Sequence, residues 1–222
     1  MRNTRARARA ALALALMLAG AGLGAGTARA QNGGSDSDVV RLKLEPGELS
    51  LGRSDAPLTM VEFTDYQCPY CRRFQAEVWP RLKRNYIDTG KLRYLARDLP
   101  LEFHSAAAPA AEAAHCAGEQ GKFWDMHAAL LAGEMDFASG GIERRARALK
   151  LDMTLFGECV ARRKYAELIA AHVREADAAG IDGTPGFIVG RASGAVLDGL
   201  RVEGALPYEE FAGLLNELLA AH

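Results

Sequence analysis

Two cysteines three positions apart constrain this 222-residue chain most strongly, because the residues around them predict definite elements. The motif Cys68-Pro69-Tyr70-Cys71 follows a β-rich apolar run at Leu58–Thr64 and opens a stretch with helical spacing at Pro69–Ile87. A proline suits the first turn of a helix, where the backbone N–H has no intrahelical partner. Pro80 lies further inside this stretch and predicts a kink. The sequence thus predicts a strand and a helix joined at a Cys-x-x-Cys turn.

The remaining pattern predicts an α/β fold that is interrupted by helices. A second strand at Lys91–Leu95 completes a right-handed βαβ unit. Helical stretches then follow at Ser105–Ala117, Lys122–Leu131, Ile142–Lys150, Thr154–Ala161 and Tyr165–Ala179. The chain ends with short strands at Phe187–Val189 and Arg201–Gly204 and an amphipathic helix at Tyr208–Ala221. We interpret Arg191–Leu200, between the two short strands, as a loose loop; a surface elaboration is the alternative.

Cysteines at this spacing form either a redox disulfide or half of a zinc site. A structural zinc ion needs four ligands, commonly supplied by a second Cys-x-x-Cys or a His-x₃₋₅-His pair. The five histidines are scattered and Cys116 and Cys159 stand apart, so neither pair occurs. The strand-to-helix context favours redox chemistry, and we expect no metal.

Redox chemistry requires the two sulfur atoms to play different roles. Cys68 is expected at the start of the helix, where unpaired N–H groups and the helix dipole stabilise a thiolate. We therefore expect Cys68 to be exposed and to be the nucleophile, with a lowered pKa, and Cys71 to be the resolving thiol. Arg72, one helical turn from Cys68, is expected to add positive charge.

The first thirty residues have the pattern of a secretory signal peptide. Met1–Arg9 is basic, Ala10–Ala19 is apolar, and Ala28-Arg29-Ala30 has the form that signal peptidase cleaves, which predicts a cut before Gln31. An uncleaved membrane anchor is the alternative. Export predicts a periplasmic or other extracytoplasmic location, where disulfides persist.

The charge balance excludes several classes of partner. The chain holds 27 Lys and Arg against 28 Asp and Glu. Residues 1–30 contain five arginines and no acid, so the remainder carries 22 basic and 28 acidic residues, a net charge of −6. A domain this acidic is a poor match for nucleic acid or for an anionic membrane surface.

Three features together resemble the DsbA-like group of thiol:disulfide oxidoreductases. They are the Cys-Pro-Tyr-Cys motif, Glu62 six residues before it, and the run Gly183-Thr184-Pro185-Gly186 directly before a strand. The resemblance extends from about Leu58 to the C-terminus and implies a thioredoxin fold with an inserted all-helical domain. The segments it implies are a signal peptide at 1–30, a linker and short extension at 31–56, the first half of the thioredoxin fold at 57–103, a helical insertion at 104–162 and the second half at 163–222.

The same resemblance assigns roles to individual residues. It implies that Glu62 is buried beneath the cysteines and transfers protons. It also implies that Pro185 is a cis-proline facing the cysteines and that the backbone of Thr184 binds an extended substrate segment. Pro69 and Tyr70 are implied to line the substrate site. The alternatives are an exposed Glu62 and an ordinary trans-proline turn.

Two residues depart from the family pattern. Tyr70 stands where the best-known members have histidine, so we expect a less acidic nucleophile and a less strongly oxidising disulfide. Gly186 replaces the bulkier residue that often follows the cis-proline, and we expect it to widen the substrate groove.

Cys116 and Cys159 remain, both within the expected insertion. Some relatives carry a non-catalytic pair, so the resemblance favours a structural disulfide; two buried free thiols or a regulatory disulfide are the alternatives.

Phe123 and Trp124 are expected in the core. His104 is expected to cap a helix or to be exposed, with a place at the active-site rim as the alternative.

Together these expectations describe an exported dithiol oxidase that introduces disulfides into secreted or periplasmic proteins, acting as a monomer without a cofactor. Its implied partners are reduced, folding exported proteins and a quinone-linked membrane protein, similar to DsbB or to vitamin K epoxide reductase, that reoxidises the cysteines. A disulfide reductase or isomerase is the alternative among enzymes. A metal-binding or chaperone-like module that uses the Cys-x-x-Cys pair is the alternative from another class.

Overall fold

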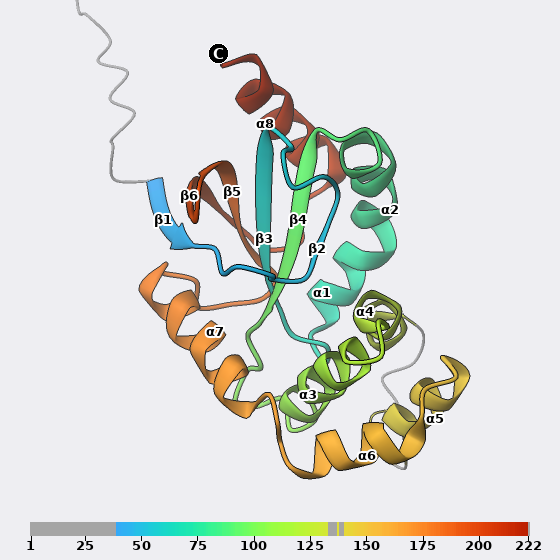
Figure 1. Ribbon diagram of the computed structural model, residues 1–222. Helices are drawn as coiled ribbons and strands as arrows, with labels where there is room; N and C mark the ends of the chain where they lie inside the picture. The colour runs from blue at the N-terminus through green and yellow to red at the C-terminus, as the bar shows by residue number, and fades with distance from the viewer. Residues whose placement is uncertain (1–38, 133–136, 138–139, 222) are drawn as a thin grey trace, which may run out of the picture. The chain divides into compact units, whose positions relative to one another are not determined.

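A six-stranded mixed sheet forms the centre of the computed structural model, which describes residues 39–132, 137 and 140–221 (Figure 1). The strands are β1 (Val39–Lys43), β2 (Ser50–Leu51), β3 (Leu58–Thr64), β4 (Leu92–Asp98), β5 (Gly186–Ser193) and β6 (Val196–Glu203), and their order in the sheet is β1-β6-β5-β3-β4-β2. Strand β3 runs parallel to β4 and antiparallel to β5. The expected signal peptide at 1–30 lies outside the described residues.

Helices cover both faces of the sheet and one end of it (Figure 1). They are α1 (Pro69–Arg73), η2 (Phe74–Val78), α2 (Trp79–Leu82), η3 (Lys83–Ile87), α3 (Ala107–Gly118), α4 (Phe123–Leu131), α5 (Gly141–Ala148), α6 (Met153–Ala161), α7 (Ala166–Ala178) and α8 (Tyr208–Ala220). The predicted helix from Pro69 to Ile87 alternates between α and π winding, because η2 and η3 are π-helical. Pro80 lies in the first turn of α2, directly after η2, so its missing N–H falls where the winding changes.

Successive side chains of β3 point to opposite faces of the sheet, and so they pack in two separate layers of the core. All seven residues of β3 are buried. Met60 packs in one layer with Phe74 of η2, whereas Val61 packs in the other with Ala176 of α7. Because successive residues of a strand point to opposite faces, Glu62 shares the face of Met60, beneath the helix that begins at the cysteines.

Strands β5 and β6 form a tight hairpin, so the expected loose loop at Arg191–Leu200 is wrong. Pairing continues as far as Ser193 opposite Val196, which leaves a turn of two residues, Gly194 and Ala195. Gly194 has a φ of 59°, the conformation that the first position of a type II′ turn requires. The segment is rich in small and polar residues, so its sequence lacks the apolar pattern that predicts a strand. It is extended nevertheless, because β5 and β6 pair with each other along their whole length.

The segment expected as a linker and short extension, residues 31–56, contains two strands that the sequence did not predict. Strand β1 pairs with β6 and β2 pairs with β4, both antiparallel. Only Leu42 is buried in β1, and β2 is two residues long. Neither strand therefore shows the alternation of apolar and polar residues from which a strand is predicted. Strand β4 also continues to Asp98, beyond the predicted end at Leu95.

Helices α3 to α6 gather at one end of the sheet, within the expected insertion (Figure 1). Cys116 of α3 and Cys159 of α6 are joined by a disulfide with an S–S distance of 2.07 Å and Cα atoms 5.8 Å apart. Phe123 is buried and Trp124 is half-buried, as expected of core residues.

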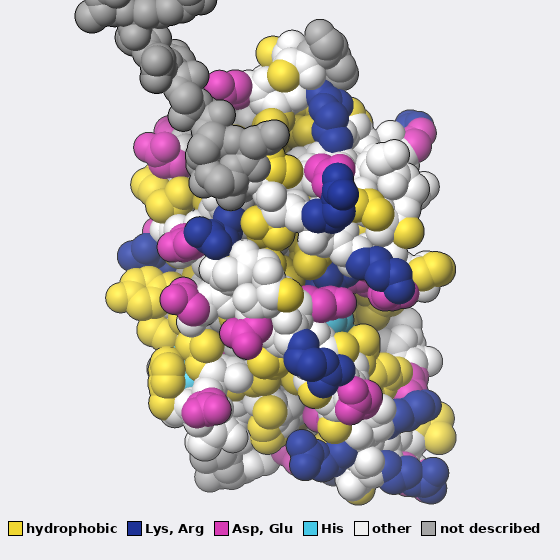
Figure 2. All heavy atoms as spheres, turned by 90° about the vertical axis from the view of Figure 1, so that its left-hand side faces the viewer, with side chains coloured by type: hydrophobic (Ala, Val, Ile, Leu, Met, Phe, Trp, Pro, Cys, Tyr) yellow, Lys and Arg dark blue, Asp and Glu magenta, His cyan; other side chains and the backbone are white. Residues whose placement is uncertain are grey.

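On the face of the molecule formed by β1 and α7, basic and acidic side chains are interspersed (Figure 2).

Candidate active site

The two motif cysteines lie where β3 gives way to α1. Cys68 is the residue before the helix, with an extended backbone at φ −71° and ψ 124°, and Pro69 occupies the first helical turn. This geometry follows from the sequence, because proline disfavours helical conformation in the residue before it and suits the first turn itself. Cys71 therefore lies one turn inside the helix, with no exposed surface. Cys68 is 3% exposed, so the expectation of an exposed nucleophile is wrong.

Asp65 holds the turn that leads from the strand to the cysteines. Its backbone carbonyl accepts a hydrogen bond from the N–H of Cys68 at 3.1 Å. Its buried carboxylate accepts from the backbone N–H groups of Gln67 at 2.7 Å and Leu101 at 2.9 Å. The same carboxylate lies 2.8 Å from Nδ1 of His104. These bonds fix the loop that presents Cys68.

His104 is therefore neither a helix cap nor an exposed residue, and that expectation is wrong. Its side chain is 15% exposed and contacts the active-site loop through Asp65. Helix α3 begins three residues later, after Ala106, without a side-chain cap. The spacing to the helix favoured a cap, but a buried carboxylate offers the imidazole a stronger partner than exposed backbone N–H groups do.

Cys68 faces the loop before β5, where the Thr184–Pro185 peptide bond is cis. When protonated, its thiol donates to the carbonyl of Thr184 at 3.3 Å. A hydrogen bond from the Cys71 thiol lowers the pKa of Cys68 to about 5, although burial opposes this shift. The Thr184 side chain lowers the same pKa, and its hydroxyl has no other partner in the described part of the chain. Cys68 is thus a thiolate at neutral pH.

The backbone at the start of α1 also stabilises the Cys68 thiolate. Hydrogen bonding with the backbone of Cys71 and of Tyr70 lowers the pKa of Cys68. Arg72 donates to the carbonyl of Leu130 in α4 at 3.3 Å, so it bridges the cysteine helix to the insertion.

Cys71 has the opposite environment. Burial raises the pKa of its thiol well above the usual value, and the hydrogen bond with Cys68 and the charge of Glu62 raise it further. The backbone N–H of Asp65 lies 3.5 Å from its sulfur. The proton therefore stays on Cys71 while Cys68 is ionised, which separates a nucleophile from a protonated partner.

Glu62 is buried in the middle of the sheet, with 1% of its surface exposed. It lies in register between Ala96 of β4 and Phe187 of β5. The hydroxyl of Tyr94 donates to one carboxylate oxygen, and the other has no partner among the described residues. Burial raises the pKa of Glu62 to about 7, against a hydrogen bond from Tyr94 that lowers it. A carboxyl group with this pKa can give or take a proton near neutrality.

A family model described as thioredoxin matches residues 44–217. The chain belongs to the thioredoxin family. This confirms the expected thioredoxin fold, and the helical insertion has counterparts among solved DsbA structures. The alpha-DsbA1 of Wolbachia pipientis superposes with a TM-score of 0.71 at 24% identity, covering 80% of this chain and 92% of that one.

Two sequence relatives carry different names and are matched over different shares of their length. Disulfide bond formation protein D of Bacillus subtilis is 33% identical over 93 residues, 40% of this chain and 41% of that protein. The Na(+)/H(+) antiporter NhaA 3 of Salinispora tropica is 43% identical over 139 residues, 62% of this chain. The chain spans about 21% of the length of that antiporter, so the match concerns one part of a longer protein.

One further sequence-based expectation on this thioredoxin-family site turns out differently. Gly186 does not widen a groove, because a Cβ there would lie 2.4 Å from Cγ2 of Ile181 in the core. A small pocket of about 130 Å³ instead adjoins Thr184 and Pro185 on the side of Gly204. Tyr70 projects from the first turn of α1 and is 55% exposed, with the Arg73 guanidinium 5.3 Å from its ring centre.

Sequence reasoning missed Asp65 and Tyr94 as members of the site. Asp65 stands directly between the strand and the motif, a position where a short polar side chain commonly holds a turn, so this signal was available. Tyr94 reaches Glu62 only because β3 and β4 pair in register, which no local pattern reveals. In the described residues neither motif cysteine belongs to a group of three or more close candidate metal ligands.

Proposed function

We propose that this protein is an exported thiol:disulfide oxidoreductase that acts as a dithiol oxidase on other proteins. The observation that carries the proposal is the division of protons between the cysteines: the pKa of Cys68 is about 5, and that of Cys71 lies well above its usual value. A thiol that ionises this readily stabilises the reduced enzyme and is a good leaving group, and both properties favour transfer of the disulfide to a substrate.

The reaction begins with the Cys68–Cys71 disulfide closed. A substrate thiolate attacks the sulfur of Cys68, the S–S bond breaks, and the electron pair passes to Cys71. Glu62, with a pKa of about 7, supports protonation of that leaving thiolate. A second substrate thiolate then attacks the substrate sulfur of the mixed disulfide and releases Cys68 as a thiolate. The substrate loses two electrons, and the enzyme is left as the reduced dithiol.

Substrate binding is proposed at the loop before β5. The carbonyl of Thr184 lies 3.3 Å from the sulfur of Cys68, so an extended segment that pairs with this backbone would lie within reach of the nucleophile. The exposed ring of Tyr70 and the first-turn Pro69 border the same sulfur along the chain. Unfolded or folding proteins with free thiols fit such a site, because main-chain pairing does not depend on sequence.

Turnover requires a partner that removes two electrons from the reduced enzyme, and we propose a quinone-linked membrane protein in this role. Extracytoplasmic location is part of the proposal, supported by the basic and apolar residues 1–30 and by the bonded Cys116–Cys159 pair. No helix in the described part of the chain has the length and apolar character needed to span a membrane.

The redox potential of the Cys68–Cys71 pair tests the direction of the reaction. Equilibration in glutathione buffers, followed by thiol counting, is expected to give a value more oxidising than about −200 mV. Cys68→Ser is the control, because it cannot form the disulfide. A potential near that of thioredoxin, about −270 mV, would overturn the oxidase direction and favour a reductase.

The clients can be identified with a variant that stalls the reaction. Cys71→Ser keeps the nucleophile but removes the resolving thiol, so mixed disulfides between Cys68 and client proteins accumulate. Expression with the natural N-terminus, followed by non-reducing separation, is expected to show these adducts outside the cytoplasm. Absence of adducts from Cys71→Ser, with the Cys68 thiolate intact, would contradict action on proteins.

A further inference from the structure

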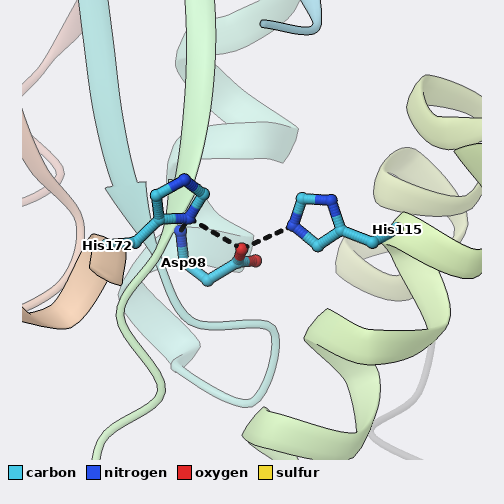
Figure 3. Close-up of side chains that lie close together, drawn as sticks. All are labelled: Asp98, His115 and His172. Atoms are coloured by element: carbon cyan, nitrogen blue, oxygen red, sulfur yellow. Dashed lines mark hydrogen bonds and ion pairs between the residues drawn. The ribbon is translucent and has the colours of Figure 1, made fainter. Parts of the chain in front are cut away.

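A second cluster of reactive side chains lies where the carboxyl end of β4 meets α3 and α7 (Figure 3). Asp98 is the last residue of β4, His115 projects from α3 and His172 from α7. All three are buried, with exposed fractions of 2%, 6% and 7%. Neither the fold nor the proposed thiol chemistry requires these residue types here.

The two imidazole rings converge on one carboxylate oxygen (Figure 3). Oδ2 of Asp98 lies 2.7 Å from Nε2 of His115 and 3.1 Å from Nδ1 of His172. All three candidate ligand atoms lie within 4.8 Å of one another. Small side-chain rotations would bring them to the spacing of about 3.3 Å that bond lengths of roughly 2.0–2.1 Å around one zinc ion require.

Protons alone satisfy this cluster poorly. Nδ1 of His172 lies 3.2 Å from the backbone N–H of Asp98, a contact in which the nitrogen must accept. The same nitrogen faces the carboxylate of Asp98 at 3.1 Å, a contact in which it must donate. One ring nitrogen cannot do both, since it carries either a proton or a lone pair. A cation bound at Oδ2 would favour the unprotonated form of this nitrogen, whose single lone pair would then turn from the Asp98 N–H to the ion.

The cluster borders a cavity of about 570 Å³ that both histidines help to line. Asp98 does not line this cavity, so an ion and a water ligand would reach the cluster from the side of the two histidines. Its lining carries four acidic side chains and one basic side chain, Glu45, Glu48, Glu119, Glu175 and Arg97. Each of these acids already has a cationic partner: Arg97 pairs with Glu48 at 2.8 Å and with Glu175 at 2.9 Å, Lys43 with Glu45 at 2.9 Å and Lys164 with Glu119 at 2.6 Å. The attraction for a cation therefore comes from the buried carboxylate and imidazoles of the cluster itself.

We propose that Asp98, His115 and His172 bind a divalent transition-metal ion, with zinc as the representative. Two imidazole nitrogens and one carboxylate oxygen suit such ions, whereas calcium and magnesium prefer oxygen ligands alone. The ion would tie the helical insertion, through α3, and helix α7 to the end of β4. This site is independent of the cysteine pair and of the proposed thiol exchange.

Metal titration of the oxidised wild-type protein tests the site, because the closed Cys68–Cys71 disulfide leaves no free thiol to bind metal. After treatment with EDTA, cobalt(II) is expected to bind with a stoichiometry of one and to give visible absorption, and zinc is expected to displace it and raise the melting temperature. The Cys68→Ser/Cys71→Ser variant is expected to behave identically. Absence of stoichiometric binding to the oxidised protein would overturn the proposal.

Variants then locate the site. His115→Gln and His172→Gln are each expected to weaken zinc binding by about 100-fold or more, because each removes a direct ligand. His127→Gln is the matched control, since His127 is also a buried histidine of the insertion but bonds to Tyr66 instead. If both ligand variants bound zinc with unchanged affinity, the proposed ligands would be wrong.

A measurement on the wild-type protein guards against variants that fail to fold. With ¹⁵N-labelled histidine, zinc is expected to shift the ring nitrogens of two of the five histidines and to leave the others unchanged. Nε2 of one ring and Nδ1 of the other should carry the change, as the geometry of His115 and His172 requires. A shift confined to other histidines would contradict the proposed ligands.

Discussion

At the residue scale, one sulfur atom is ionised and its neighbour three positions away is not. The difference comes from hydrogen bonds that converge on Cys68 at the start of a helix, from the depth at which Cys71 is buried, and from the charge of Glu62, which raises the pKa of Cys71. Tyr70 stands at the position of the family's histidine with 55% of its surface exposed, and this division of protons holds without an imidazole there.

The ionisation of Cys68 gives the first prediction. Absorbance at 240 nm of the reduced protein is expected to rise with a midpoint near pH 5. Cys71→Ala removes the strongest hydrogen bond to the thiolate and is expected to raise this midpoint by about one unit. Cys68→Ser should abolish the transition. A wild-type midpoint near 8.5, the value of a free thiol, would contradict the proposed nucleophile.

Glu62 gives a prediction about stability. Its pKa is raised from the model-compound value of 4.5 to about 7, so the folded protein favours the protonated carboxyl. Its favourable contribution is therefore complete below pH 4.5 and is lost as the pH rises through 7. Glu62→Gln keeps a neutral side chain and is expected to stabilise the protein by about 1–3 kcal/mol above pH 7, with little effect at pH 4.5.

Urea denaturation of the reduced protein at pH 4.5 and 8 measures this difference. Glu77→Gln, which replaces an exposed carboxylate in η2, is the control and should show no gain with pH. Equal stability of Glu62→Gln and wild type at both pH values would mean that the carboxylate is not held in the protonated form.

At the element scale, the hairpin of β5 and β6 shows how close backbone approach selects residues. Gly190 pairs with Gly199 across the two strands. A Cβ on Gly190 would lie 2.0 Å from the carbonyl oxygen of Asp198. The strands lie this close because neither carries a side chain at this position, and the hairpin supports the loop that presents Thr184 to Cys68.

Gly190→Ala is therefore expected to destabilise the protein by about 3 kcal/mol or more, because backbone rather than a flexible side chain must move. Gly213→Ala is the matched control: Gly213 is exposed in α8, and its added Cβ would meet nothing within 4 Å. That change is expected to stabilise by about 0.5–1 kcal/mol, since alanine favours the helix. Denaturant unfolding gives the free energy of unfolding of both variants. Equal changes in this free energy would contradict the prediction.

At the scale of the whole molecule, long-range bonds tie the helical insertion to itself and to the sheet. The Cys116–Cys159 disulfide closes a segment of 43 residues within the insertion. Asp98, His115 and His172 join the insertion and α7 to the end of β4. The insertion is thus anchored beside the loop that carries the nucleophile.

Removal of the disulfide tests its contribution. The loop-entropy relation gives about 4 kcal/mol for a ring of this size, so Cys116→Ala/Cys159→Ala is expected to lower the free energy of unfolding by about 2–4 kcal/mol. The redox potential of Cys68–Cys71 should stay unchanged, since neither motif cysteine contacts this pair. Unchanged stability, or a shifted potential, would show that the disulfide has a different role.

The sequence alone determined those features that depend on neighbours along the chain. The strand at Leu58–Thr64, the turn at the cysteines and the start of the helix at Pro69 follow from hydrophobic period and from the restricted backbone of proline. The same local signals, combined with the resemblance to DsbA-like proteins, indicated the family and the loop at Thr184–Pro185.

Tertiary structure decided which distant residues meet. Tyr94 reaches Glu62 only through the register of β3 and β4, and His104 reaches Asp65 although helix capping was its nearer option. Asp98, His115 and His172 converge from three separate elements, without any motif spacing along the chain. A local pattern reports which face of an element is buried, whereas pairing register and packing set what that face meets, so these contacts could not be derived from the sequence.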